Sequence, residues 1–205
     1  MKLYPLFLLM ATATIFSPGP GVVMTLSNAL RYGFRGTFGG ILGVAFGALI
    51  VAGISATSVG VVLAASATAF AVLKYLGAAY LIFLGIKLWR APAFQFTEKT
   101  THEASFKRRF LEGLSLQITN PKAIFFFLSI FPQFIDPDIS YGMQFCVLVL
   151  TYSTLIMLIH SSYALFAGRA KNWLTSEKGG SRMNKIGAAT FIFFACMLAG
   201  AKRST

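Results

Sequence analysis

Long apolar runs, separated by short polar turns, follow one another along nearly the whole chain. Each run is long enough for the roughly 20 residues that an α-helix needs to cross a bilayer. Barrel strands would be about 10 residues long and would alternate polar and apolar positions, which these runs do not. We therefore predict an all-α integral membrane protein with six transmembrane helices, at residues 4–30, 37–62, 69–88, 109–134, 143–167 and 185–201.

The first and fourth runs are interrupted by helix-breaking residues, FSPGPGV in one and TNPK in the other. A proline inside a helix costs about 3 kcal/mol, and in lipid the freed backbone groups have no water to bind. At both interruptions an N-cap residue precedes a proline, Ser17 before Pro18 and Asn120 before Pro121. A new helix commonly begins with this pair. We therefore predict that each run consists of two half-helices.

The two halves of the chain repeat these features in the same order. KYLGAAYLIFLG, from Lys74, matches NKIGAATFIFFA, from Asn184, and the two interruptions fall in the first helix of each half. Three helices per half place the halves in opposite orientation, and inverted repeats with interrupted helices are typical of secondary transporters. We predict a single transporter domain over 1–205, made of repeat 1 at about 1–90, a cytoplasmic connector at 91–108, and repeat 2 at about 109–205.

The net charge of +12 is distributed unevenly among the predicted turns. In a soluble protein such a charge would suggest nucleic acid. Here the turns after the first, third and fifth helices hold most of the Lys and Arg residues, which the positive-inside rule places in the cytoplasm. We therefore expect a multi-pass protein with both termini outside the cytoplasm, and no nucleic-acid partner. Ala11-Thr12-Ala13 imitates a signal-peptide cleavage site, but the apolar pattern continues past it and the repeat requires this segment.

The second half-helix of each interrupted run starts at a candidate binding site. Free backbone N–H groups and the positive end of the helix dipole suit a carboxylate there, and Lys122 adds a full charge that could meet a substrate carboxylate or an acidic side chain. Alternatively, both interruptions are packing kinks, and Lys122 reaches polar backbone or water. We favour a substrate site because the interruptions are related by the repeat. Its predicted residues are Ser17, Pro18, Gly19, Pro20, Gly21, Thr119, Asn120, Pro121 and Lys122.

Two ionisable residues inside the predicted helices are candidates for proton coupling. Ionisable groups in a span are costly and are often functional. Glu112 precedes the second interruption, and His160 lies in the fifth helix. Either group could exchange a proton for substrate; alternatively, Glu112 pairs with a neighbouring arginine and His160 is a packing residue. No Asp or Glu lies deep in a span, so we predict a neutral or weakly polar substrate.

Three motifs resemble the LysE/RhtB family of bacterial amino-acid exporters: SPGP in the first helix, LKYLGAAYLIFLG in the third, and F-x-x-G, Phe110 to Gly113, followed by TNPKAIFFF in the fourth. The resemblance covers essentially the whole chain. It implies proton-driven export, across the bacterial inner (plasma) membrane, of an amino acid or close derivative such as homoserine, threonine, homoserine lactone or leucine. Members often carry an asparagine after the first PGP, where this chain has Gly21, so contacts of that asparagine cannot be transferred.

Other readings fit the sequence less well. A transmembrane thiol electron carrier would use Cys146 and Cys196, but neither has a C-x-x-C partner or a basic neighbour. A metal exporter or a channel is the third reading. A metal site needs clustered ligands, and the two histidines are far apart; uphill, proton-dependent flux would distinguish a carrier from a channel. We expect no metal, no cofactor and no catalytic residues. The inverted repeat indicates a secondary active transporter rather than an enzyme. Glycines at 39, 43 and 47 permit close helix approach, which we assign to an internal contact, with a homodimer as the alternative.

Overall fold

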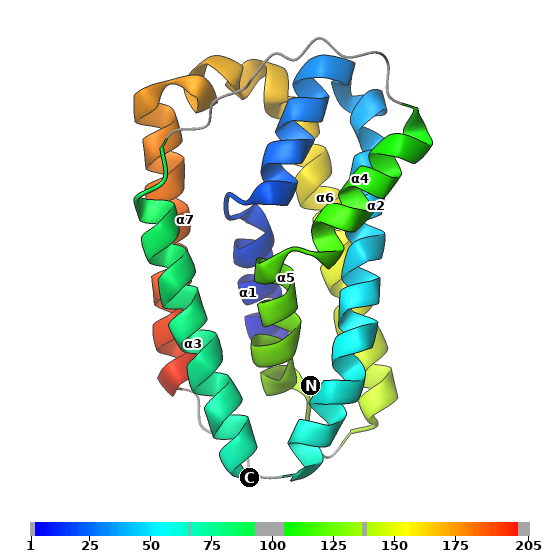
Figure 1. Cartoon of the computed structure of the whole chain (residues 1–205), viewed down its shortest axis with the longest axis vertical. Helices are drawn as coiled ribbons and strands as arrows, with labels where there is room; N and C mark the ends of the chain where they lie inside the picture. Colours follow the sequence, from blue (N-terminus) through cyan, green and yellow to red (C-terminus); the bar gives the residue numbers. More distant parts are fainter. Residues whose placement is uncertain (1–2, 66, 93–104, 137–138, 201–205) are drawn as a thin grey trace.

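The computed structural model describes residues 3–65, 67–92, 105–136 and 139–200, and within these ranges the chain is helical and contains no strand. The predicted all-α class is therefore confirmed. Figure 1 shows most helices running along the long axis of an elongated bundle. The elements are α1 (Tyr4–Phe16), α2 (Pro20–Ala65), α3 (Ala67–Trp89), α4 (Phe106–Ile118), α5 (Pro121–Phe125), the π-helical η1 (Phe126–Ile130), the 3-10 helix η2 (Phe131–Phe134), α6 (Tyr141–Thr175) and α7 (Glu177–Gly200).

Helix α2 consists of two arms that meet at Gly33. This residue has φ of 67°, in the left-handed region that favours glycine, and its conformation interrupts the helix. The chain reverses there, so that the first arm rises from the centre of the molecule and the second runs back along its side (Figure 1). The predicted turn between the first two spans, residues 31–36, is thus placed at Gly33.

Within the described residues, two helical stretches are long and apolar enough to cross a membrane, Pro20–Ala56 and Tyr141–Arg169. A third arises if α4 and the segment Pro121–Phe134, bent by 50° at their break, count as one span. Helix α7 begins at Glu177 rather than at 185. Residues 93–104, most of the predicted connector, lie outside the described residues.

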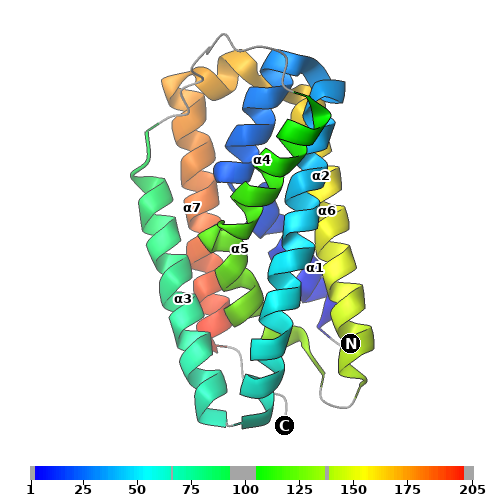
Figure 2. The same ribbon diagram turned by 45° about the vertical axis from the view of Figure 1, so that its right-hand side comes forward.

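The helices pack in two groups that meet around α1 and α5. Helix α2 packs against α4 and α6, while α3 pairs with α7 along its length (Figure 2). The α2–α4 contact uses the glycine stripe of the second span, because a Cβ at Gly43 would meet the carbonyl oxygen of Phe110, and a Cβ at Gly47 would lie 2.6 Å from Cβ of Gln117. The predicted internal contact is thus found, and its partner is α4.

Aromatic rings form the core around the second interrupted run. Phe126 and Phe127 are buried, and Phe126 lies between Phe7 of α1 and Tyr152 of α6, at ring-centroid distances of 6.1 and 4.7 Å. Phe7 also packs on Phe134, at 5.3 Å. These contacts fix α1 and the segment after the second break against α6.

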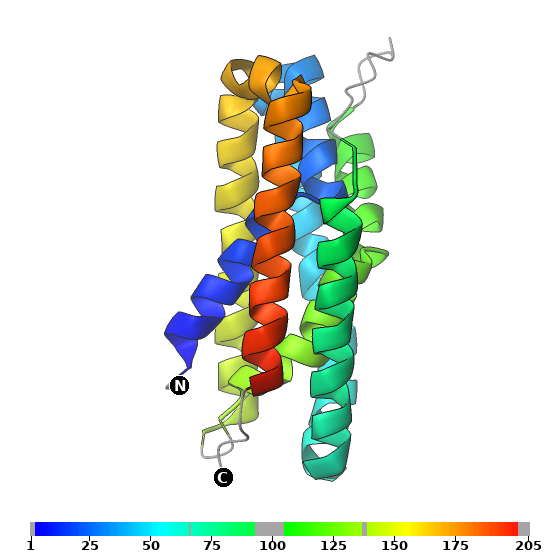
Figure 3. The same ribbon diagram turned by 90° about the vertical axis from the view of Figure 1, so that its left-hand side faces the viewer.

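Segments that carry the basic residues lie at one end of the bundle. The turn at Gly33, the start of α4 and the α6–α7 junction share this end, whereas α1 begins and α7 ends toward the other (Figures 1 and 3). Arg31, Lys107 and Arg182 belong to these segments. The charge asymmetry of the sequence is therefore also an asymmetry of the folded molecule.

Candidate functional site

The two predicted helix breaks are present, and they touch each other. The first separates α1, which ends at Phe16, from α2, and the second separates α4 from α5. The ammonium of Lys122, at the second break, donates hydrogen bonds to the carbonyl oxygens of Thr14, at 2.8 Å, and of Ser17, at 3.0 Å. One side chain therefore joins two breaks that lie more than a hundred residues apart in sequence.

The second break follows its predicted capping pattern. The side-chain oxygen of Asn120 accepts a hydrogen bond from the backbone N–H of Lys122, at 3.1 Å, and Pro121 occupies the first helical position. The Asn120 amide also donates to the side-chain oxygen of Gln117, at 3.2 Å, and so ties α4 to the start of α5.

At the first break the predicted cap is wrong. The backbone N–H of Ser17 ends α1 by bonding the carbonyl of Ala13, and its buried hydroxyl has no hydrogen-bond partner. Helix α2 starts at Pro20, and Gly19 is the capping residue whose carbonyl accepts from Val23. The cause is the second proline, because a residue directly before proline is disfavoured in helical geometry and the helix can begin only after Gly19.

Lys122 completes the C-terminal end of α1. The last carbonyls of a helix lack intrahelical partners and carry the negative end of its dipole, so an ammonium there is favourable. The sequence left several partners open for Lys122, namely a substrate carboxylate, an acidic side chain, polar backbone or water. In the structure its ammonium binds backbone carbonyl oxygens. Gly19 lies against the same ammonium, since a Cβ at this residue would be 3.0 Å from the Lys122 Nζ.

A cavity of about 20 Å³ lies beside the two breaks, large enough for about one water molecule. His160 reaches it from α6 and is buried, with its Nδ1 2.7 Å from the hydroxyl of Thr25. Gly21 lies next to the imidazole, because a Cβ there would be 3.2 Å from the His160 Cε1. The residues that line this cavity are Ile15, Gly21, Val22, Val44, Gln117, Asn120, Lys122, Tyr152, Ile156 and His160.

Not every predicted residue belongs to this cavity. Pro20, Pro121 and Thr119 are exposed, and the Thr119 hydroxyl bonds the carbonyl of Ser115 in its own helix. Glu112 is exposed on α4 and does not line the cavity. Ser17 and Pro18 face a different space, described below.

Sequence reasoning missed three polar residues near the breaks. Gln117 and Tyr152 line the cavity, and Thr25 orients His160. Gln117 could have been found from the sequence, because it is a polar residue about one helical turn before Asn120 in an otherwise apolar run. Thr25 and Tyr152 had no such signal, because both fit an ordinary helix.

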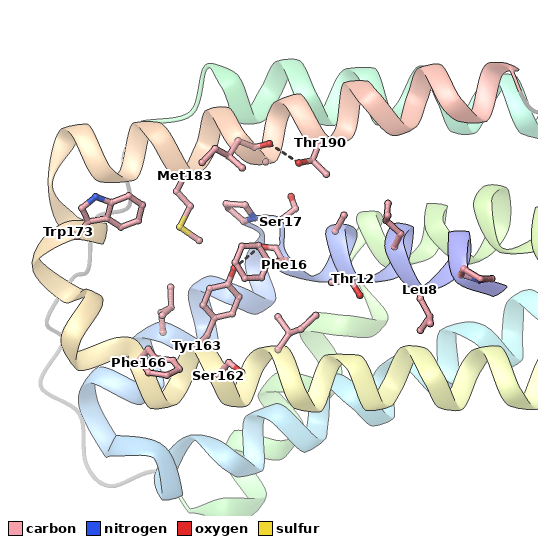
Figure 4. Close-up of a pocket in the computed structure, with 18 residues that line it drawn as sticks. Leu8, Thr12, Phe16, Ser17, Ser162, Tyr163, Phe166, Trp173, Met183 and Thr190 are labelled. Carbon is pink, nitrogen blue, oxygen red and sulfur yellow. Dashed lines mark hydrogen bonds between the residues drawn. The ribbon is translucent and has the colours of Figure 1, made fainter. Parts of the chain in front are cut away.

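A larger pocket of about 830 Å³ lies between α1, α6 and α7 (Figure 4). Its lining is predominantly apolar. Tyr163 and Phe16 both line it, and the Tyr163 hydroxyl donates a hydrogen bond to the carbonyl of Phe16, at 2.6 Å. Helix α7 touches the first break beside this pocket, where a Cβ at Gly187 would lie 2.7 Å from Cδ of Pro18. We call this pocket the apolar groove.

Cys146 and Cys196 are free and exposed. In the described part of the chain, no three or more His, Cys, Asp or Glu residues gather in a way that could hold a metal ion.

Together, the apolar helices and the paired breaks are typical of a helical membrane protein. The sequence pattern of the LysE type translocators matches residues 12–202. A membrane protein of Vibrio cholerae without an assigned function is 37% identical over 193 residues, which are 93% of this chain and 94% of that protein. The homoserine/homoserine lactone efflux proteins of Salmonella typhi and Salmonella typhimurium are each 32% identical over 198 residues, 97% of this chain and 96% of theirs.

The chain belongs to the LysE type translocator family and is a membrane transporter. The resemblance drawn from the sequence is thereby confirmed. No solved structure matches the chain.

Proposed function

We propose that this protein exports a neutral amino acid or a close derivative, of the homoserine, threonine, homoserine lactone or leucine type, in exchange for protons. The observation that carries the proposal is the meeting of the two breaks through Lys122. Two relatives that cover nearly the same length are efflux proteins for homoserine and homoserine lactone. The substrate carboxylate would take over the ammonium from the two carbonyls that hold it here.

The lining of the small cavity supports a neutral side group. Lys122 and His160 belong to it, and none of the described residues that line this cavity is acidic. A lysine or arginine substrate would bring a second cation beside Lys122 without a counter-charge, which is unfavourable in a buried site. A neutral substrate places only its carboxylate against the ammonium.

Transport then requires the breaks to separate. The cavity holds about one water, so an amino acid enters only if the helices around it move apart. We assign this movement to rocking of two inverted three-helix repeats, which would expose the site alternately to each side. The pairing of α3 with α7 and the contact between the breaks support this symmetry.

Of the two proton-coupling candidates, the geometry favours His160. Its imidazole lies in the same cavity as Lys122, so substrate binding and protonation can influence each other there. Glu112 is exposed on α4. We further propose six crossings of the inner membrane with both termini in the periplasm, supported by the gathering of basic segments at one end of the bundle.

The test uses purified protein in liposomes with an acidic interior, so that protons leaving down their gradient drive labelled substrate inward. We expect accumulation of homoserine, threonine or leucine above the external concentration. Lysine and arginine should not accumulate, and an ionophore that removes the proton gradient should abolish the uphill step. Liposomes without protein are the control.

Two outcomes would contradict the proposal. Preferential accumulation of lysine would refute the neutral substrate. Flux that only equilibrates the substrate, whatever the proton gradient, would indicate a channel.

A further inference from the structure

The apolar groove continues along one face of α6. Ile159, Tyr163 and Phe166 line it, and Trp173 lines its end near the α6–α7 junction (Figure 4). On the α1 wall, the lining residues Pro5 and Phe16 are separated by about 17 Å along the helix, at about 1.5 Å per residue. One leaflet contributes roughly 15 Å of hydrocarbon. The groove therefore has the length of a lipid chain rather than of a compact solute.

Two of the three helices that form the groove, α6 and α7, each carry an arginine near the same end of the groove. On α6, Arg169 stands three residues after Phe166 and four before Trp173, so it shares their face. On α7, Arg182 stands four residues before the lining residue Ile186. Both arginines are exposed. Two exposed arginines on different helices thus lie, along their helices, next to residues that line the groove.

The junction between these arginines is basic overall. Between residues 169 and 185 the sequence contains one acidic residue, Glu177, against Arg169, Lys171, Lys178, Arg182 and Lys185. Basic pockets between transmembrane helices bind anionic lipid headgroups. Trp173, at the end of the groove, is a residue type enriched at membrane interfaces, where headgroups lie.

We propose that the groove between α1, α6 and α7 is a binding site for an anionic phospholipid, with one acyl chain along the groove and the phosphate between Arg169 and Arg182. The site is separate from the cavity at the breaks. Ser17 and Pro18 form part of its wall, so the lipid chain contacts the first break at the residue whose carbonyl binds Lys122.

The test is native mass spectrometry of the detergent-purified protein with phosphatidylglycerol or phosphatidylcholine of identical acyl chains. We expect the anionic lipid to be retained about tenfold more strongly, because each surface cation attracts such lipids several-fold. The double variant Arg169→Gln/Arg182→Gln should lose this preference. Lys107→Gln/Arg108→Gln, which removes the same charge from the exposed start of α4, should keep it.

A second pair of variants tests the acyl chain. Thr190 lines the groove, and its hydroxyl bonds only the Ile186 carbonyl in its own helix among the contacts of the described residues (Figure 4). Thr190→Trp should fill the groove and reduce retention of both lipids. Phe193→Trp, on the exposed face of the same helix, should not.

Three results would overturn the proposal. One is equal retention of both lipids by the unaltered protein. Another is an equal loss of preference in the two charge variants, which would indicate overall charge. The third is a lipid-free dimer whose formation Thr190→Trp abolishes, which would assign the groove to a second copy of the chain.

Discussion

Replacing Lys122 by methionine removes the ammonium that joins the two breaks and keeps most of the side-chain length. Hydrogen bonds that involve a charged group contribute about 1.5–3 kcal/mol each, so its two bonds amount to about 3–6 kcal/mol. Part of this is offset because the variant no longer buries a cation, which costs several kcal/mol. We expect a net destabilisation of about 1–3 kcal/mol, left mainly by the unpaired carbonyls of Thr14 and Ser17.

The variant should also weaken the binding of substrate. A substrate carboxylate that loses one charged partner loses about 1.5–3 kcal/mol, equivalent to about 10- to 150-fold in affinity. The assay is concentration-dependent uptake of labelled homoserine into liposomes, together with thermal unfolding in detergent. A melting temperature lower by about 2–10 °C is expected for a chain of this size.

The matched control is Lys87→Met, which removes a lysine from the exposed last turn of α3. It should leave uptake and melting temperature unchanged. The reasoning is refuted if Lys122→Met melts at a lower temperature but transports with unaltered affinity. Lys122 would then serve only to hold a kink together.

The remaining predictions concern the packing, the second break and the proton. Gly43→Ala should lower the melting temperature, since overpacking costs about 1–3 kcal/mol, whereas Gly53→Ala, with nothing within 4 Å of its added Cβ, should be neutral or slightly stabilising. Asn120→Ala should cost about 1 kcal/mol through loss of its cap, seen in thermal unfolding. His160→Asn should abolish the proton dependence of uptake while exchange of labelled for unlabelled substrate persists, and Glu112→Gln should leave both unchanged. If Glu112→Gln, and not His160→Asn, removed the proton dependence of uptake, proton coupling would belong to Glu112 instead of His160.

The sequence predicted local features of the fold well, because they follow from local chemistry. Asn120-Pro121 specifies a cap and a first helical position, and the structure has both. At SPGP the same rule was applied to the first proline, although the second one decides where α2 begins. A double proline motif offers two possible helix starts, and the restriction that Pro20 places on Gly19 selects the later one.

Long-range features of the site could be predicted only as alternatives. The partner of Lys122 depends on where α1 ends relative to α5, which no spacing along the chain specifies. The exposure of Glu112 and the burial of His160 likewise depend on the rotation of α4 and α6 against their neighbours. The apolar groove escaped prediction because its walls come from three separate helices that each look ordinary.

The contact between Gly187 and Pro18 has a mechanical consequence. Gly187 has no side chain, so the backbone of α7 approaches the proline ring directly: a Cβ at this residue would lie 2.7 Å from Cδ of Pro18. We therefore expect that a tilt of the α3–α7 pair toward α1 would displace Pro18 and, with it, the neighbouring Ser17 peptide whose carbonyl binds Lys122. A movement of α3 and α7 would in this way reach the place where the two helix breaks meet.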